Sequence, residues 1–444
     1  MFIKVVRQPW APALIVAIPL AVTYLVVAPS AGDLAAATYR SDLFARVGFT
    51  TWDTGWYAAH GYGLPGYSLL SPALGALLGV RLLLALSALV ASTLFALIAK
   101  RVFCATAARV AAAWFALGFC VGLLSGRVPY DLGFALGLAS VLALLRGALP
   151  ATLGLAVLTS IASPVAGAFL GLAGLAIASA APRRGVAVCA AALIPVLVLS
   201  VAYPNGGYEP FASSAFWPAL TGLLLIALLL PQGSLTRRGR LTLRVGAGLY
   251  ALALIGAYTI QTPVGGNAAR LGPLLAAPLL AGILWERHRA WLLALTPLLL
   301  YWQLATPIRD YASLAGDPSV SASYYAPLLA ELRTLNRGEK TIVEVPLTKA
   351  HWESAYLAGH DGVELARGWE RQLDTRYAAI FYRSTLSSAA YRAWLIENRV
   401  HYVALPKAPL DRAGVKEGEL IARGEPYLRE LWRSEHWRLY RFMG

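Results

Sequence analysis

The sequence predicts a polytopic α-helical membrane protein with about eleven transmembrane helices, its N-terminus inside, and a C-terminal extracytoplasmic α/β domain. Of the 444 residues, 58% are hydrophobic and only 14% are charged, and the mean hydropathy is +0.59. The apolar residues form repeated runs of about 15–20, long enough to cross a bilayer core of roughly 30 Å. Residues 305–444 are instead rich in charge. We therefore expect a transmembrane domain at residues 1–304 and an outer domain at 305–444.

The N-terminal segment is expected to be the first span. Residues 1–32 begin with charge and continue with an apolar run, as a signal peptide does. The run is long, and Pro29 disfavours cleavage between small residues, so we expect the segment to stay attached. A proline and small residues interrupt the apolar sequence at residues 160–167, either as a tight outer turn or as a re-entrant bend. Hydropathy places the spans at residues 11–28, 82–99, 106–124, 131–145, 149–162, 165–181, 186–203, 216–230, 243–260, 271–284 and 290–304.

Basic residues predict the orientation of these spans. With the N-terminus inside, the inner loops hold fourteen lysines and arginines, and the outer loops before residue 305 hold five. This bias follows the positive-inside rule. Five of the six acidic residues before residue 305 fall in outer loops, so the chemically active groups gather on the outer face. The odd number of spans places residues 305–444 outside as well.

The outer domain is predicted from alternating helix and strand patterns. Helices are expected at residues 324–335, 387–400 and 425–433, and strands at 341–348, 401–406 and 436–442. This alternation is typical of a small α/β domain. No glycine-rich phosphate loop follows any of these strands, so nothing marks the domain as nucleotide-binding.

Composition excludes several classes of protein. The net charge of +15 does not indicate a nucleic-acid partner, because the basic residues lie in short loops between spans and in the outer domain. Cys104, Cys120 and Cys189 lie in or beside apolar spans, which excludes a disulfide framework and a CxxC metal pair. Arginine outnumbers lysine and alanine is abundant, which is typical of a GC-rich bacterial genome. We expect a multi-pass protein in the lipid bilayer of the bacterial plasma (inner) membrane.

The first outer loop, residues 29–81, is predicted to form the wall of an active site. An acidic and aromatic loop is costly to place beside lipid unless it has a function. Asp33 follows the first span by only a few residues, and it is our candidate for a general base, with Asp42 and Asp53 as alternates. The aromatic residues of the loop suit either stacking on a sugar ring or anchoring at the membrane interface. They include Trp52, Trp56 and Tyr57.

Two short motifs and the architecture carry a resemblance to a known superfamily. The acidic motif is Gly32-Asp33-Leu34-Ala35, and residues 60–67, HGYGLPGY, precede the second span. With the predicted spans and outer domain, these features resemble the GT-C superfamily, the polytopic glycosyltransferases that include protein mannosyltransferases and aminoarabinose transferases. The resemblance implies transfer of a sugar from a polyprenyl-phosphate-linked donor to a cell-envelope glycan, lipid or protein. The Asp-Glu pair of several relatives is here Asp33-Leu34; no cofactor is firmly implied, and a divalent metal stays open.

Polar residues elsewhere are candidates for substrate binding. Arg127 and Asp131 lie in one predicted outer loop and Arg270 follows a glycine pair in another. Arginine forks match phosphate oxygens, although an arginine at a span end also snorkels to the interface. His60 is expected either to hold a substrate or to bond to the loop backbone. In the outer domain, the segment that holds Arg367, Trp369 and Arg371 either binds the acceptor or forms a solvated charged face.

The outer domain also holds histidines that do not form a zinc motif. His351, Glu353, His360 and Asp361 lack the HExxH spacing. Glycosyl transfer is our leading interpretation, with two alternatives. One is a multi-span transporter, although the predicted spans contain almost no acid or lysine at mid-membrane for ion coupling. The other is a catalytically inactive GT-C-like assembly protein of the cell envelope.

Overall fold

The computed structural model describes residue 8 and residues 10–204, 206–229, 236–286 and 288–444, which divide into two compact units. The first, here called the helical unit, comprises Met1–Pro29, Tyr67–Ala202 and Glu209–Tyr311. The second, the sheet unit, comprises Ser30–Gly66, Tyr203–Tyr208 and Ala312–Gly444. The sheet unit is therefore assembled from three separate stretches of chain. Its first stretch is most of the outer loop predicted at residues 29–81.

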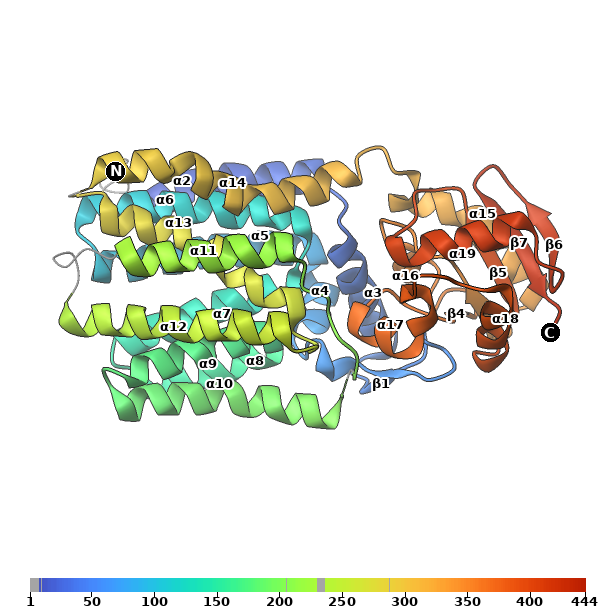
Figure 1. Ribbon diagram of the computed structural model, residues 1–444, viewed down its shortest axis with the longest axis horizontal. Helices are drawn as coiled ribbons and strands as arrows, with labels where there is room; N and C mark the ends of the chain where they lie inside the picture. Colours follow the sequence, from blue (N-terminus) through green and yellow to red (C-terminus); the bar gives the residue numbers. More distant parts are fainter. Residues whose placement is uncertain (1–7, 9, 205, 230–235, 287) are drawn as a thin grey trace. The chain divides into compact units, whose positions relative to one another are not determined.

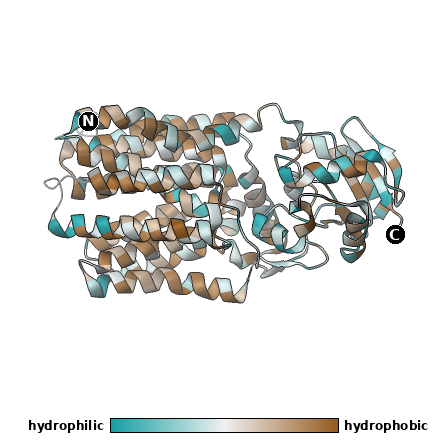
Figure 2. Cartoon of the chain, viewed as in Figure 1, coloured by the Kyte–Doolittle hydropathy of each residue, from teal (hydrophilic) through white to brown (hydrophobic). Residues whose placement is uncertain are grey.

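The helical unit is a bundle in which each predicted span corresponds to one helix (Figure 1). Within a bilayer the backbone has no water to bond, so helices are the form that such apolar segments adopt. Hydrophobic residues run along these helices (Figure 2). Their bounds are α2 Ala11–Val27, α5 Val80–Val102, α6 Ala105–Gly122, α7 Val128–Leu145, α8 Leu149–Ala162, α9 Pro164–Ala178, α10 Pro182–Ala202, α11 Ser213–Leu229, α12 Arg237–Thr259, α13 Leu271–Leu284 and α14 Arg289–Ser313, with the short α4 Ser71–Leu78 before α5.

Seven helices among the described residues are long and apolar enough to cross a membrane: α5, α6, α7, α10, α12, α13 together with the 3-10 helix Gly265–Arg270 that leads into it, and α14. An eighth is added if α2 and the following helix α3 (Gly32–Val47) form one bent span. The expectation of a polytopic helical membrane protein is confirmed. Helices α8, α9 and α11 are apolar but have only 14, 15 and 17 residues. The count of eleven spans and their orientation stay predictions.

The interruption predicted at residues 160–167 lies between α8 and α9. Ser163 adopts an extended conformation and its hydroxyl accepts a hydrogen bond from Ala166 N at 3.3 Å. Pro164 then occupies the first turn of α9, where its missing N–H costs nothing. Beyond this break, α9 packs closely on α10, because Gly174 has no side chain to keep the two helices apart. A Cβ there would lie 2.6 Å from the backbone nitrogen of Cys189.

The sheet unit contains a five-stranded mixed sheet of order β4-β3-β5-β7-β6. Strand β3 pairs in parallel with β4 and β5, while β7 pairs antiparallel with β5 and β6. This sheet with its helices confirms a sheet-containing C-terminal region. The strands are β3 Thr341–Glu344, β4 Val363–Leu365, β5 Tyr402–Pro406, β6 Leu428–Arg433 and β7 Trp437–Phe442, and the helices are α15 Ala322–Asn336, α16 Glu353–Tyr356, α17 Arg371–Tyr377, α18 Ser388–Glu397 and α19 Arg412–Arg423.

One predicted element of this unit is wrong. Residues 425–433 were expected to form a helix, but Leu428–Arg433 is the edge strand β6. Their apolar spacing suits an amphipathic helix, yet a tight turn returns the chain, with Ser434 N donating to Trp437 O at 2.9 Å. Pairing with β7 then satisfies the backbone of these residues. Tertiary pairing therefore overrides the local pattern.

The N-terminal stretch of the sheet unit packs against strand β4. Helix α3 is followed by a small hairpin of β1 (Trp52–Asp53) and β2 (Tyr62–Gly63). Ala58 N donates to Leu365 O at 3.0 Å and Leu365 N donates to Gly55 O at 2.9 Å. These backbone bonds tie residues 55–58 to the end of β4. The acidic loop is thus an integral part of the sheet unit.

Candidate functional site

Asp33, the candidate base, lies in the first turn of α3 and is partly buried. Its neighbour Gly32 lies against His351, because a Cβ on Gly32 would be 3.2 Å from the ring carbon Cδ2 of that histidine. The Asp33 carboxylate is also close enough to interact electrostatically with the His351 ring. The structure therefore brings the acidic motif next to a histidine more than three hundred residues away in the chain. Sequence reasoning had noted His351 only as a residue without metal-site spacing.

The two alternate bases have different surroundings. Asp53 is partly buried, and its Oδ2 accepts a hydrogen bond from the Tyr39 hydroxyl at 2.8 Å. Asp42 is exposed on the same helix as Asp33. His60 is exposed too, and its ring stacks on Tyr377 at a centroid distance of 4.6 Å. Asp53 is thus held by a tyrosine, whereas Asp42 faces solvent.

The aromatic residues of the first loop divide into buried and exposed ones. Trp56 is fully buried, stacked on Tyr39 at 4.9 Å and on Tyr62 at 5.8 Å, and its Nε1 donates to Ser354 O at 2.9 Å. Tyr57 is also fully buried. Trp52, in contrast, is 55% exposed. In this conformation Trp52 is available to a ligand, and the other two belong to the core of the unit.

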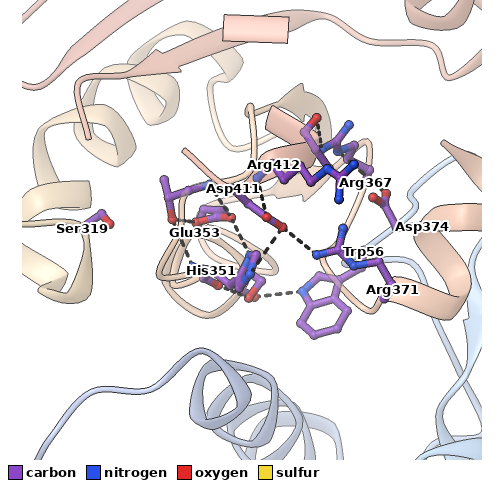
Figure 3. Close-up of polar contacts among 12 residues, drawn as sticks. Trp56, Ser319, His351, Glu353, Arg367, Arg371, Asp374, Asp411 and Arg412 are labelled. Carbon is purple, nitrogen blue, oxygen red and sulfur yellow. Dashed lines mark hydrogen bonds and ion pairs between the residues drawn. The ribbon is translucent and has the colours of Figure 1, made fainter. Parts of the chain in front are cut away.

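His351 lies within a ring of polar groups (Figure 3). Its Nε2 is 3.7 Å from Asp411 Oδ2, and its Nδ1 is 4.0 Å from Glu353 Oε1. Arg371 Nη2 donates to the same oxygen of Asp411 at 2.9 Å. The imidazole ring of His351 also stacks on the indole ring of Trp369 at a centroid distance of 4.6 Å. Two predicted acceptor-binding residues therefore lie around His351, Trp369 in direct contact with it and Arg371 through Asp411.

Burial determines the charge states of His351 and Glu353. It lowers the pKa of His351 to about 4, since the surrounding protein disfavours the imidazolium. Burial likewise raises the pKa of Glu353 to about 7, although hydrogen bonds from Thr348 oppose this rise. At neutral pH His351 is therefore uncharged.

Arg367, another predicted binding residue, is enclosed within the sheet unit. Its side chain is fully buried, with its nitrogens 3.6 Å from Glu344 and Glu417 and 3.8 Å from Asp374. The guanidinium also lies 3.8 Å from the centroid of the Phe381 ring. Burial and the neighbouring carboxylate raise the pKa of Glu344 well above its usual value, so the cluster retains a proton. Arg367 is therefore part of the buried interior of the sheet unit, where it lies among three carboxyl groups.

In the helical unit, the three predicted polar residues gather around one tyrosine. Tyr130 is buried in the first turn of α7, and Arg127, Asp131 and Arg270 all interact with it electrostatically. The guanidinium of Arg270 lies over the Tyr130 ring, 5.5 Å from its centroid. Asp131 is only 7% exposed. Two arginines and a buried carboxylate thus converge near the start of α7.

Two further polar residues of this cluster were missed. Asp310 Oδ2 lies 3.8 Å from Arg127 Nη2 and accepts a hydrogen bond from the Ser125 hydroxyl at 2.7 Å. Asp310 escaped notice because the last span was predicted to end at residue 304. Helix α14 continues to Ser313 and carries Asp310 to the Arg127 side chain. Among the described residues, no group of three or more His, Cys, Asp or Glu suits a metal ion.

Comparison with known proteins finds a likeness in structure alone. No family model matches the sequence, and no curated protein matches it. The crystal structure of the Archaeoglobus fulgidus oligosaccharyltransferase, tethered to an acceptor peptide with the NVT sequon, matches with a TM-score of 0.51. The match covers 89% of this chain and 68% of that chain at 11% sequence identity. The chain therefore shares its fold with an oligosaccharyltransferase.

Proposed function

We propose that this protein is a GT-C-type glycosyltransferase of the bacterial plasma membrane. It transfers a sugar from a polyprenyl-phosphate-linked donor to an extracytoplasmic glycan, lipid or protein. The observation that carries the proposal is the cluster of Arg127, Arg270 and Asp131, because Asp131 is the one charged side chain that is buried among the described residues of the helical unit. Ionisable groups in such a bundle are expensive and are typically functional. The shared fold adds support.

The residues divide the chemistry between them. Asp33 accepts the proton of the acceptor hydroxyl as its oxygen bonds to the anomeric carbon of the sugar. The bond between that carbon and the phosphate oxygen breaks, and the electron pair leaves with the polyprenyl phosphate. Within the helical unit, Arg127 and Arg270 are the candidates to bind the phosphate of the donor. Asp131 accepts hydrogen bonds from sugar hydroxyls. Asp42 and Asp53 remain alternate bases, and a divalent metal remains open.

The sheet unit supplies the acceptor-binding residues in this proposal. Exposed Trp52 offers a face for a sugar ring or an apolar acceptor, and partly buried Arg371 and Trp369 lie beside the His351 ring. Aromatic faces and arginine forks suit glycans and carboxylates alike. The oligosaccharyltransferase of similar fold was captured with an acceptor peptide, so a protein acceptor is the first to try.

The test measures donor binding and transfer in lipid nanodiscs with a panel of short-chain polyprenyl-phosphate sugars. Arg127→Gln and Arg270→Gln are each expected to weaken donor binding by about 10–100-fold, because each removes charge-assisted hydrogen bonds to phosphate. Arg146→Gln is the matched control, since Arg146 is exposed just beyond the other end of α7. Asp33→Asn is expected to abolish transfer while donor affinity stays unchanged.

Three outcomes would contradict this function. If every arginine variant, the Arg146 control included, binds the donors equally well, the cluster does not bind phosphate. If no donor of the panel binds, but the protein moves solutes across proteoliposome membranes, the transporter interpretation replaces it. Donor binding without transfer to glycan, lipid or peptide acceptors would favour the inactive assembly protein.

A further inference from the structure

We infer that His351 is a positioning residue for Asp33: its ring, packed on Gly32, fixes the first turn of α3 and the carboxylate that follows. The inference rests on the proposed role of Asp33 as the base. It identifies a residue of the C-terminal stretch that acts on the acidic motif of the N-terminal stretch, both within the sheet unit.

The backbone of His351 is held in a costly conformation. Its φ angle is +59°, in the left-handed region that a residue with a Cβ rarely occupies. Hydrogen bonds compensate: His351 N donates to Thr348 Oγ1 at 3.1 Å, and the Ser354 hydroxyl donates to His351 O. Strain of this kind persists where the surroundings fix it, often at functional sites. In this backbone conformation the imidazole ring lies against Gly32.

Three contacts then fix the ring itself. Trp369 stacks on its face at 4.6 Å with the two planes 13° apart. Asp411 lies beside Nε2 and Glu353 beside Nδ1, at 3.7 and 4.0 Å (Figure 3). Position 32 is correspondingly tight, because a Cβ there would lie 3.2 Å from the ring. Glycine at this position lets the first turn of α3 lie against the imidazole.

The charge of His351 also suits a base at its side. The charged groups around the ring are Asp33, Glu353, Asp411, Arg371 and Arg367. Burial is the dominant influence, and it keeps the imidazole neutral near pH 7. A neutral imidazole acts on the first turn of α3 through its packing and position rather than through a full positive charge. The Asp33 carboxylate favours the protonated form of the His351 ring, although the effect of burial is larger and keeps the ring neutral.

The first test reads this coupling without any substrate. In the full-length protein in nanodiscs, deuterium exchange at the imidazole C2 carbon reports the protonation midpoint of each histidine by mass spectrometry. Asp33→Asn is expected to shift the His351 midpoint to lower pH, since the carboxylate that favours imidazolium is lost. His436 is the internal control, because it too stacks on an aromatic ring, Tyr324, at 4.9 Å. Asp42→Asn should leave His351 unchanged. An unchanged His351 midpoint in Asp33→Asn would overturn the inference.

The second test changes the steric contact between position 32 and the His351 ring, and leaves the charges unchanged. Gly32→Ala should lower kcat by about tenfold with KM unchanged, because the methyl group displaces the ring and the turn that carries Asp33. In the His351→Ala background the same substitution has room, so the double variant should be no slower than His351→Ala alone. Additive losses would contradict positioning by the ring. If the wild type transfers no sugar, the proposed function fails, and the exchange measurement still decides the inference.

Discussion

Glu353 makes the stability of the sheet unit depend on pH in an unusual direction. The side chain is 1% exposed, with Thr348 Oγ1 donating to its Oε2 at 2.5 Å and Thr348 N to its Oε1 at 3.2 Å. Burial raises its pKa from 4.5 to about 7 in the folded protein. Between these two values the folded state binds more protons than the unfolded state. The stability that this group contributes is therefore complete below pH 4.5 and is lost as pH rises to about 7.

The magnitude follows from the two pKa values. Each tenfold change in proton affinity is worth about 1.4 kcal/mol, so the loss reaches about 3 kcal/mol above pH 7. Glu353→Gln removes the titrating group and leaves a side chain of the same shape. Between pH 5 and pH 8 the stability of the variant relative to the wild type should rise by about 2–3 kcal/mol, whatever constant offset the substitution itself introduces. This difference corresponds to about a hundredfold in protection from exchange.

Amide hydrogen exchange of peptides from residues 341–357 measures the effect within the full-length protein. Comparing variant and wild type at each pH cancels the intrinsic pH dependence of exchange and the titration of other groups. Glu339→Gln is the control, because Glu339 is exposed at the start of the same region. A variant–wild-type difference that stays constant from pH 5 to 8 would refute the reasoning, since it would mean that Glu353 is already ionised in the folded protein at pH 5.

Two further predictions concern packing. Gly174→Val should destabilise the helical unit by about 1–3 kcal/mol, because the new side chain would meet the backbone of Cys189. Gly154→Val is the control and should not destabilise the unit, because nothing lies within 4 Å of a Cβ at that position. Thermal unfolding in nanodiscs compares the two variants. Trp56→Ala should destabilise the sheet unit by about 3–5 kcal/mol, and Trp52→Ala should change its stability little, because only Trp56 is buried. Equal losses in either pair, by thermal unfolding or by exchange, would contradict the packing described.

The helical part of the fold was predictable because lipid leaves the backbone few options. Every apolar run predicted as a span corresponds to a helix, since hydropathy reports the environment that forces helix formation. The ends were less predictable. Helix α14 continues nine residues past the predicted end at residue 304, to Ser313, because its last turns are polar but still compatible with a helix. Strand β6 was missed for a related reason, since its pairing with β7 outweighs a pattern that suits a helix.

The candidate site was predictable only in part. Arg127, Asp131 and Arg270 are rare polar residues at the ends of apolar segments, so composition alone singles them out. Arg367 was singled out in the same way, but no local pattern reveals that carboxylates of β3 and α19 enclose it. The contact of His351 with Gly32 depends on two segments at opposite ends of the chain. One sequence carries no local signal for such a contact.

The assembly of the sheet unit from three stretches of chain constrains how often the intervening chain crosses the membrane. Parts of one folded unit lie on one side of a bilayer, so an even number of crossings must separate residues 66 and 203, and again residues 208 and 312. The first interval holds α5, α6, α7 and α10 as candidate spans, with or without the pair α8 and α9, and either total is even. The second holds α12, α13 and α14, an odd number. If those three helices span the membrane, we predict that α11, although only 17 residues long, crosses it as well.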